Sequence, residues 1–343
     1  MQRLVLLNQK TLASTVTLEG VGLHTGRQCK VTIEPAPENS GVTFKTKNPS
    51  GQEKTVSALW QNVHNTVLCT ELRGTNGQKV RTVEHLLSAI RACNLDNIII
   101  SCSDNEIPIL DGSALPFVHA IRQAGVRVQR APRRLIKIRK PVRISFEDKW
   151  VEYLPHNGCR YDMEIDFKNP AIGNQVMTFE LSYERFVKEI APARTFGELE
   201  QASGLHAAGL ALGSNLSNTL VFDKDIVVSH EGKRFDDECV RHKILDAIGD
   251  LHLIGGPILG HFRGYKSGHK MHARLLKEVM SSTSAYSWVQ TGSHDIDDSY
   301  PSEDIVTLEG TTDLSGQSSE KNKQNIKLSN VQPLDDDPAL IPT

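Results

Sequence analysis

The sequence has few aromatic residues and lacks a long apolar segment. Phe, Trp and Tyr make up 6% of the 343 residues, and all hydrophobic residues together 38%, below the usual globular share. We therefore expect part of the chain to lie outside any packed core. A window of about 18 consecutive apolar residues is missing, which excludes a spanning helix but leaves a peripheral membrane contact open. Without a cleavable signal pattern at the N-terminus, we expect a cytoplasmic protein.

Three motif classes are also missing. The six cysteines form no CxxC pair, as is typical of proteins in a reducing compartment. Neither GxGxxG nor GxxxxGK[ST] lies between a predicted strand and a predicted helix, which disfavours a dinucleotide or P-loop nucleotide site. Basic and base-stacking aromatic residues do not alternate, so we expect no nucleic-acid partner.

The formal net charge of −2 hides an uneven distribution. Residues 281–343 carry a balance of −8, which leaves +6 on the rest of the chain. The same segment is rich in Ser, Thr, Asp and Gly, and we expect it to be an acidic, disordered tail whose role and partner stay open. A mildly basic body suits an anionic substrate, although an ordinary surface excess of lysine and arginine explains it equally well.

Strand-like and helix-like segments alternate through the rest of the chain. Strands are predicted at 29–36 and 97–103 and a helix at 82–95. The same mixture recurs after a linker at 132–134, with a helix predicted over 241–254 that ends at a Gly-Gly-Pro breaker. The pattern predicts an α+β fold with an N-terminal domain, 1–131, and a C-terminal domain, 132–280.

Histidines and carboxylates gather in three clusters. They are Glu84 with His85, then His242 with Asp246 and Asp250, and finally His269 after a glycine. The spacing of the second cluster is i, i+4, i+8, which places its members along one helix face. Two imidazoles and one carboxylate can hold a catalytic zinc ion with an open position, while a neighbouring carboxylate serves as general base and another histidine as acid.

The spacing alone leaves a simpler interpretation open. A single His-x-x-x-Asp on an amphipathic helix is more often a surface or buried polar pair than a metal site. The Glu84-His85 order is also not the HExxH of common zinc peptidases, so that mechanism cannot be transferred.

Seven short strings together resemble one family. They are GVGLHTG (20–26), NTVLCT (65–70), TVEHLLSA (82–89), EIPILDGSALPFV (106–118), ARTFG (193–197), RFDDECVRHKILDAIGDL (234–251) and YKSGH (265–269). In this order, over about residues 10–280, they are similar to the UDP-3-O-acyl-N-acetylglucosamine deacetylases, the zinc enzymes of lipid A biosynthesis. Seven collinear motifs are far more specific than any one of them.

The resemblance implies a fold and a reaction. The fold is a two-domain sandwich, each domain a β-sheet packed on a pair of α-helices, with the active site at the domain junction. The reaction is hydrolysis of the 2-acetamido group of UDP-3-O-(3-hydroxyacyl)-N-acetylglucosamine to a free amine and acetate, the committed step of lipid A biosynthesis.

The resemblance also implies roles for single residues. One catalytic Zn²⁺ ion would be held by His85, His242 and Asp246. Glu84 would be the general base, and His269, oriented by Asp250, the general acid. Thr195 would donate a hydrogen bond to the tetrahedral oxyanion.

A second set of residues is implied to bind the UDP-linked, acylated amino sugar. Lys243 and Lys266 would lie near the sugar and diphosphate, and Phe167 would face the uracil. An ordinary solvated lysine stays an alternative for Lys266. The fatty chain would enter an apolar passage in a βαβ insert near 198–221, with Leu23 and Phe196 at its mouth.

The sequence departs from the family pattern at two places. Ser214 stands where a second glycine is usual, and the insert has small residues in place of longer apolar ones, which leaves the preferred acyl-chain length open. After His269, the run Lys270-Met271-His272 replaces a typically uncharged Ala-Leu-Asn. His272 is three residues from His269 and could perturb the pKa of His269. The interpretation that we prefer is that His272 points to solvent.

Rival hypotheses are a catalytically silent regulator that binds UDP-sugar or lipid, and a zinc deacetylase for another amidated sugar. The presence of every catalytic position disfavours the first. A fused second enzyme is disfavoured because the tail is short and polar. We expect a monomer, while the sequence leaves the metal in the cell, zinc or iron, undecided.

Overall fold

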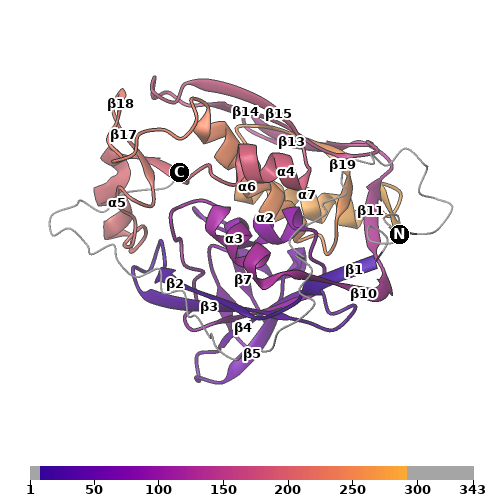
Figure 1. The fold of residues 1–343 in the computed structure, drawn as a ribbon. Helices are drawn as coiled ribbons and strands as arrows, with labels where there is room; N and C mark the ends of the chain where they lie inside the picture. Colours follow the sequence, from indigo (N-terminus) through magenta and orange to yellow (C-terminus); the bar gives the residue numbers. More distant parts are fainter. Residues whose placement is uncertain (1–7, 292–343) are drawn as a thin grey trace, which may run out of the picture.

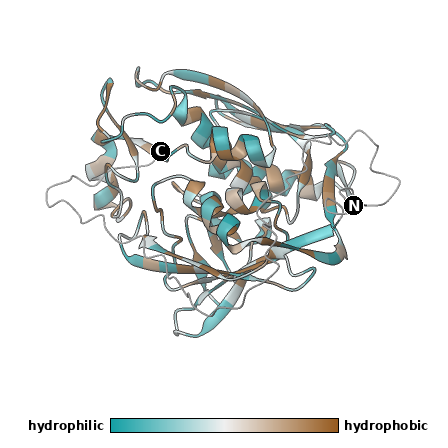
Figure 2. Ribbon diagram, in the orientation of Figure 1, coloured by the Kyte–Doolittle hydropathy of each residue, from teal (hydrophilic) through white to brown (hydrophobic). Residues whose placement is uncertain are grey.

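The computed structural model describes residues 8–291 and shows two α+β halves with their helices facing each other. In Figure 1, one twisted sheet lies below the helices and another above them, so the helices form a central layer. Figure 2 shows that hydrophobic residues gather where helices and sheets meet. This arrangement confirms the predicted α+β class of a two-domain sandwich.

The first half is built on a five-stranded sheet of order β2-β3-β9-β4-β5, in which only β4 and β9 are parallel neighbours. Helices α2 and α3 cover one face of it (Figure 1). The elements are β1 (Asn8–Leu12), β2 (Val16–Val21), β3 (Gln28–Pro35), β4 (Val42–Lys47), β5 (Glu53–Ser57), η1 (Trp60–Asn62), β6 (Val63–Asn65), β7 (Glu71–Arg73), β8 (Lys79–Val80), α2 (Glu84–Ala92), β9 (Ile98–Cys102), α3 (Leu115–Ala124) and β10 (Val126–Pro132).

The second half is built on a seven-stranded mixed sheet in which β19 pairs with β11, β13 and β14. Helices α6 and α7 pack against its inner face (Figure 1). The elements are β11 (Arg134–Ile138), β12 (Val142–Phe146), β13 (Lys149–Leu154), β14 (Cys159–Asp166), β15 (Asn174–Glu180), α4 (Tyr183–Arg185), the π-helical η2 (Phe186–Ile190), β16 (Phe196–Glu198), η3 (Leu199–Gln201), α5 (Ala202–Ala207), β17 (Leu220–Asp223), β18 (Ile226–Val227), α6 (Glu238–His252), β19 (Ile258–Tyr265), α7 (His269–Ser281) and β20 (Tyr286–Gln290).

Strand β14 shows how the sequence sets the inner face of this sheet. Tyr161, Met163 and Ile165 alternate with polar residues, and all three side chains are buried. Successive strand residues point to opposite faces, so the alternation gives one face to the helices and the other to solvent. In the described part of the chain, no helix is long and apolar enough to cross a membrane.

A small third sheet stands apart from the two layers. Strands β16 and β17 are parallel, η3 and α5 connect them, and β18 completes the sheet. Figure 1 shows this unit at the side of the molecule, beyond the ends of α2 and α3. It contains the 198–221 segment in which we expect the acyl passage.

The end of the packed body differs from the expectation. We predicted that the tail begins at residue 281, but α7 runs to Ser281 and β20 then pairs antiparallel with β11, so that Arg134 lies opposite Gln290. The strand sequence YSWVQ is short and follows a Ser/Thr-rich stretch, which hid its signal. The boundary at 281 is therefore wrong for residues 281–291, and the remainder of the predicted tail lies outside the described residues.

Helices α2 and α6 meet at the centre of the molecule with almost no space between their backbones. A Cβ atom on Gly249 of α6 would lie 2.0 Å from the carbonyl oxygen of Glu84, the first residue of α2. Only glycine therefore allows this approach. Since α2 belongs to the first half and α6 to the second, the contact fixes how the halves meet.

We expect Gly249→Ala to lower the free energy of unfolding by about 3 kcal/mol, because the added methyl group must push the two backbones apart. Urea unfolding measures this change. Gly204→Ala is the matched control: Gly204 lies in α5, and no atom comes within 4 Å of the point where the added methyl carbon would sit. The free energy of unfolding of the control should rise by up to about 1 kcal/mol. Equal stability of the two variants would contradict the close contact.

Candidate metal centre

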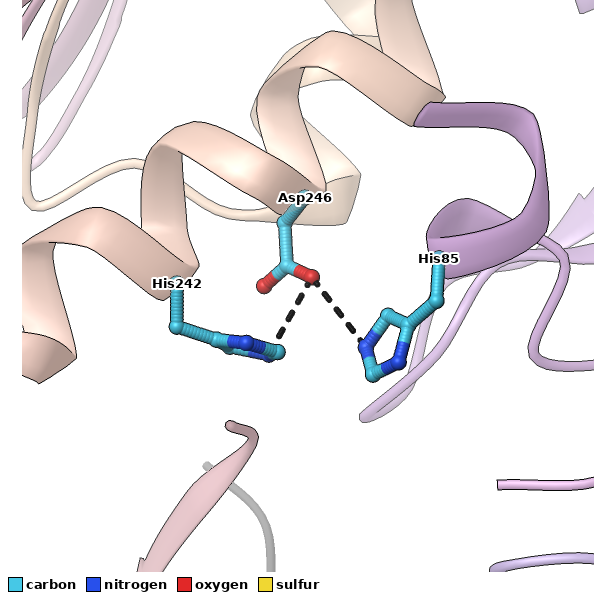
Figure 3. A group of neighbouring side chains, drawn as sticks. All are labelled: His85, His242 and Asp246. Carbon is cyan, nitrogen blue, oxygen red and sulfur yellow. Dashed lines mark ion pairs between the residues drawn. The ribbon is translucent and has the colours of Figure 1, made fainter. Parts of the chain in front are cut away.

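Two histidines and one aspartate converge where α2 meets α6. His85 comes from the first turn of α2, while His242 and Asp246 lie one turn apart on α6. Oδ1 of Asp246 is 3.7 Å from Nε2 of His85 and 3.4 Å from Nε2 of His242, as the dashed lines in Figure 3 mark. All three residues are buried, and their potential ligand atoms lie within 4.8 Å of one another.

The protonation of this group fits a bound cation. Burial lowers the pKa of His85 to about 3 and also lowers the pKa of His242, so both rings are neutral near pH 7. Nδ1 of His242 lies 3.1 Å from the carbonyl oxygen of Ala193 and donates to it, which leaves the lone pair of Nε2 facing Asp246. Oδ1 of Asp246 is buried without a hydrogen-bond donor. A divalent cation among these atoms would satisfy all of them.

Glu84 and His269 lie beside this group with pKa values shifted above their ordinary ranges. Burial raises the pKa of Glu84 to about 8. Burial alone would lower the pKa of His269, but the charge and hydrogen bond of Asp250 outweigh it and raise the pKa to about 9. Nε2 of His269 is 4.0 Å from Oε1 of Glu84. A carboxyl group and an imidazole therefore face each other at a distance that a small molecule can bridge.

Asp250 accepts hydrogen bonds at both oxygens. Oδ2 is 2.7 Å from Nδ1 of His269 and 2.8 Å from Nδ1 of His272, and Oδ1 accepts from the hydroxyl of Thr70 at 2.6 Å. Although burial opposes it, the two histidines hold the pKa of Asp250 far below its usual range. Asp250 is thus an ionised carboxylate that holds the ring of His269 by a hydrogen bond to Nδ1.

The expectation that His272 points to solvent is wrong. Its side chain is 0% exposed, and Nε2 lies 3.2 Å from the hydroxyl of Ser267. The hydrogen bond to Asp250 offsets the free-energy cost of burying the imidazole. The spacing of residues along α7 alone could not reveal this partner.

Lys243 and two aromatic rings extend from the metal group. Nζ of Lys243 is 3.3 Å from Oδ2 of Asp246 and 5.3 Å from the ring centre of Phe196. The Phe196 ring lies 6.2 Å from His242 on one side and 5.5 Å from Phe167 on the other, in edge-to-face contacts. These side chains form a continuous series of contacts that leads from Asp246 to Phe167.

Lys266 has two carboxylate partners. Its Nζ is 2.9 Å from Asp148 and 3.1 Å from Asp166, the residue directly before Phe167. The two carboxylates raise the pKa of Lys266, so its ammonium group stays charged. It is a paired lysine rather than the freely solvated one of the alternative interpretation.

Leu23 joins the first half to the small sheet of the second. It is buried in the turn between β2 and β3, and its carbonyl oxygen accepts a hydrogen bond from Gly213 at 2.9 Å. Both carboxylate oxygens of Glu106 hold this turn by accepting from the N–H groups of His24 and Thr25, each at 2.8 Å. Ser214 is buried beside the turn and shares a hydrogen bond with Thr219.

Thr195 lies on a segment with fixed backbone. Its N–H donates to Gly112 and its carbonyl oxygen accepts from Leu220, both at 2.8 Å. It directly precedes Phe196 and follows Ala193, the partner of His242, by two residues. The segment therefore lies along the metal group.

A buried ion pair anchors the same segment to α6. Nε of Arg194 lies 2.9 Å from Oε1 of Glu238, with side chains that are 1% and 0% exposed. The backbone N–H groups of Arg194 and Arg234 also donate to the Glu238 carboxylate. The sequence alone predicted neither this pair nor Thr70, whose N–H donates to Glu84 and whose hydroxyl donates to Asp250. All three residues lie inside the seven motifs, which is the signal that could have found them.

Taken together, the α+β sandwich and a buried His-His-Asp group with a carboxyl and an imidazole beside it define a metal-dependent hydrolase. A protein-family model described as UDP-3-O-acyl N-acetylglycosamine deacetylase matches residues 9–281. The chain belongs to this family.

Individual relatives agree with the family model. The chain is 44% identical over 287 residues to the UDP-3-O-acyl-N-acetylglucosamine deacetylase of Vibrio parahaemolyticus, which covers 82% of this chain and 93% of the relative. It is 41% identical over 296 residues to the deacetylase of the same name from Neisseria meningitidis, covering 85% and 96%. The similarity therefore spans nearly the whole length of these relatives.

We expect Glu238→Ala to lower the free energy of unfolding by about 3–5 kcal/mol, because it removes the buried carboxylate that pairs with the buried guanidinium of Arg194. Glu231→Ala is the control, since that carboxylate is 69% exposed and 3.9 Å from Arg194. Glu231→Ala should lower the free energy of unfolding by less than about 1 kcal/mol. Urea unfolding compares the two, and a small loss in Glu238→Ala would show that the pair does not anchor the segment.

Proposed function

We propose that this protein hydrolyses the 2-acetamido group of UDP-3-O-(3-hydroxyacyl)-N-acetylglucosamine, releasing acetate and a free amine, the committed step of lipid A biosynthesis. The observation that carries the proposal is the adjacency of two buried sets: the His85-His242-Asp246 group and the Glu84-His269 pair. The names of the relatives supply the substrate, and the residues supply the chemistry.

The cation is proposed to be one Zn²⁺ ion held by His85, His242 and Asp246. Two neutral imidazoles and one carboxylate are a ligand set that zinc accepts while keeping a position open. When bound, the ion supplies Lewis acidity, which stabilises negative charge that develops on an oxygen in this part of the site.

Glu84 is proposed as the general base. It removes a proton from the water whose oxygen forms a bond to the acetyl carbon. Its raised pKa of about 8 makes its carboxylate form a stronger base than that of an exposed glutamate. The N–H of Thr70 donates to Oε2 at 3.1 Å and leaves Oε1 turned toward His269.

His269 is proposed as the general acid. With a pKa of about 9 it is an imidazolium at neutral pH, and Asp250 on Nδ1 turns the Nε2–H toward Glu84 and the space between them. The proton of Nε2 passes to the sugar nitrogen as the C–N bond of the amide breaks. The hydroxyl of Thr195 donates to the oxyanion of the tetrahedral intermediate.

The remaining residues are proposed to bind the substrate. Lys243 and Lys266 offer positive charge to the sugar and diphosphate, and Phe167 packs on the uracil. Leu23 and Phe196 lie at the mouth of an acyl passage within 198–221, where η3, α5 and the loop to β17 lie. We further propose a cytoplasmic monomer that meets the membrane, if at all, only at its surface.

The direct test is acetate release from the UDP-3-O-acyl substrate. We expect activity to fall to background after exhaustive chelation and to return on addition of about one equivalent of Zn²⁺. A parallel reaction with the substrate that lacks the 3-O-acyl chain separates this activity from deacetylation of another amidated sugar. Full activity in a thoroughly metal-depleted sample would overturn the mechanism.

Single substitutions test the assigned roles. Glu84→Ala and His269→Ala should each lower kcat by about 10²–10⁴-fold, the usual contribution of a general base or acid. Both variants should retain bound zinc, measured by atomic emission, whereas His85→Ala should lose it. Unchanged turnover in either of the first two variants would remove that residue from the proposed chemistry.

A further inference from the structure

Two histidines of α7 share one oxygen of Asp250. His269 and His272 are one turn apart, so both project from the same face of the helix toward α6. Their Nδ1 atoms lie 2.7 Å and 2.8 Å from the same Oδ2. Only His269 has a role in the proposed reaction, which leaves a buried imidazole unexplained at the centre of the site.

The positions of the protons follow from the chemistry of the carboxylate. An ionised carboxylate can only accept hydrogen bonds, so Nδ1 of both histidines must carry the proton. The same oxygen thus receives two N–H donors, and each of them takes up part of its negative charge. His272 competes with His269 for Asp250 and at the same time holds that oxygen in place.

His272 is itself fixed on every side. Its ring packs edge-to-face on Phe262 at 5.6 Å, and Nε2 lies 3.2 Å from the hydroxyl of Ser267. Its backbone N–H donates to the carbonyl oxygen of Gly268 at the start of α7. The side chain is fully buried, so water does not replace it as a donor to Asp250.

We propose that His272 is a positioning residue for the reaction: the N–H of its Nδ1 holds Oδ2 of Asp250 toward His269 and withdraws charge from it, which keeps His269 a sufficiently strong acid. The inference rests on the proposed role of His269.

The titratable groups that face His269 come from several elements. They are Asp246 and Asp250 of α6, Glu84 and His85 of α2, and His24 in the turn after β2. Substitution of His272 leaves all of them in place. A change in the acid strength of His269 can then be assigned to the donor on Oδ2.

Three variants separate the donor from the ring. His272→Asn places an amide N–H near the position of Nδ1, His272→Gln places it near Nε2 and away from Asp250, and His272→Phe keeps the ring without a donor. Without the donor, Oδ2 carries more charge, the imidazolium of His269 is better stabilised, and it becomes a weaker acid.

We expect kcat of His272→Gln and His272→Phe to fall by about three- to tenfold with KM unchanged within about twofold. The alkaline limb of their kcat/KM profiles should move up by about half a pH unit or more. For His272→Asn, kcat and KM should stay within about twofold of the wild-type values, and the alkaline limb of the kcat/KM profile should not move. Zinc content and urea unfolding, measured on the same samples, identify any variant that has lost its fold.

An unmoved alkaline limb in the folded Gln and Phe variants would overturn the proposal, and so would a His272→Asn protein that behaves like His272→Phe. Failure of the proposed function looks different, because the wild-type protein itself would then release no acetate. If His272→Phe does not fold, the pH profile of His272→Gln against that of His272→Asn decides the question alone.

Discussion

The contact between the backbones of α2 and α6 is the constraint on which the site depends. Glu84 and His85 belong to one half of the chain and His242, Asp246 and Asp250 to the other. They meet because Gly249 has no side chain to hold the helices apart. The polar groups are thus buried by helix packing itself, and burial is what shifts the pKa values of Glu84 and His85.

Burial lowers the pKa of His85 and of His269 alike, and the neighbouring groups decide the outcome. Burial, reinforced by the neighbouring imidazole of His242, lowers the pKa of His85 to about 3, so its neutral ring is suited to bind a cation. His269, beside Asp250, retains its proton although it is equally buried. Two buried histidines of one site therefore differ in protonation at neutral pH because His269 faces an aspartate at hydrogen-bond distance.

The residues that lie together at the candidate site could be singled out from the sequence because the motifs that contain them are contiguous. The α+β class followed from the alternation of strand and helix patterns. Contacts between distant segments could not be predicted in this way. His272 was expected at the surface because nothing in α7 shows that Asp250 lies behind it, and β20 was missed because its partner β11 is about 150 residues earlier in the chain.

The pairing of β11 with β20 also closes the second half on itself. Arg134 lies opposite Gln290, and Thr291 forms hydrogen bonds in both directions with Arg133, which also pairs with Asp96 of the first half. The polypeptide enters and leaves this half at a single point. Its ends are close enough to be joined by a short linker, so the second half is a natural candidate for circular permutation with the sheet preserved.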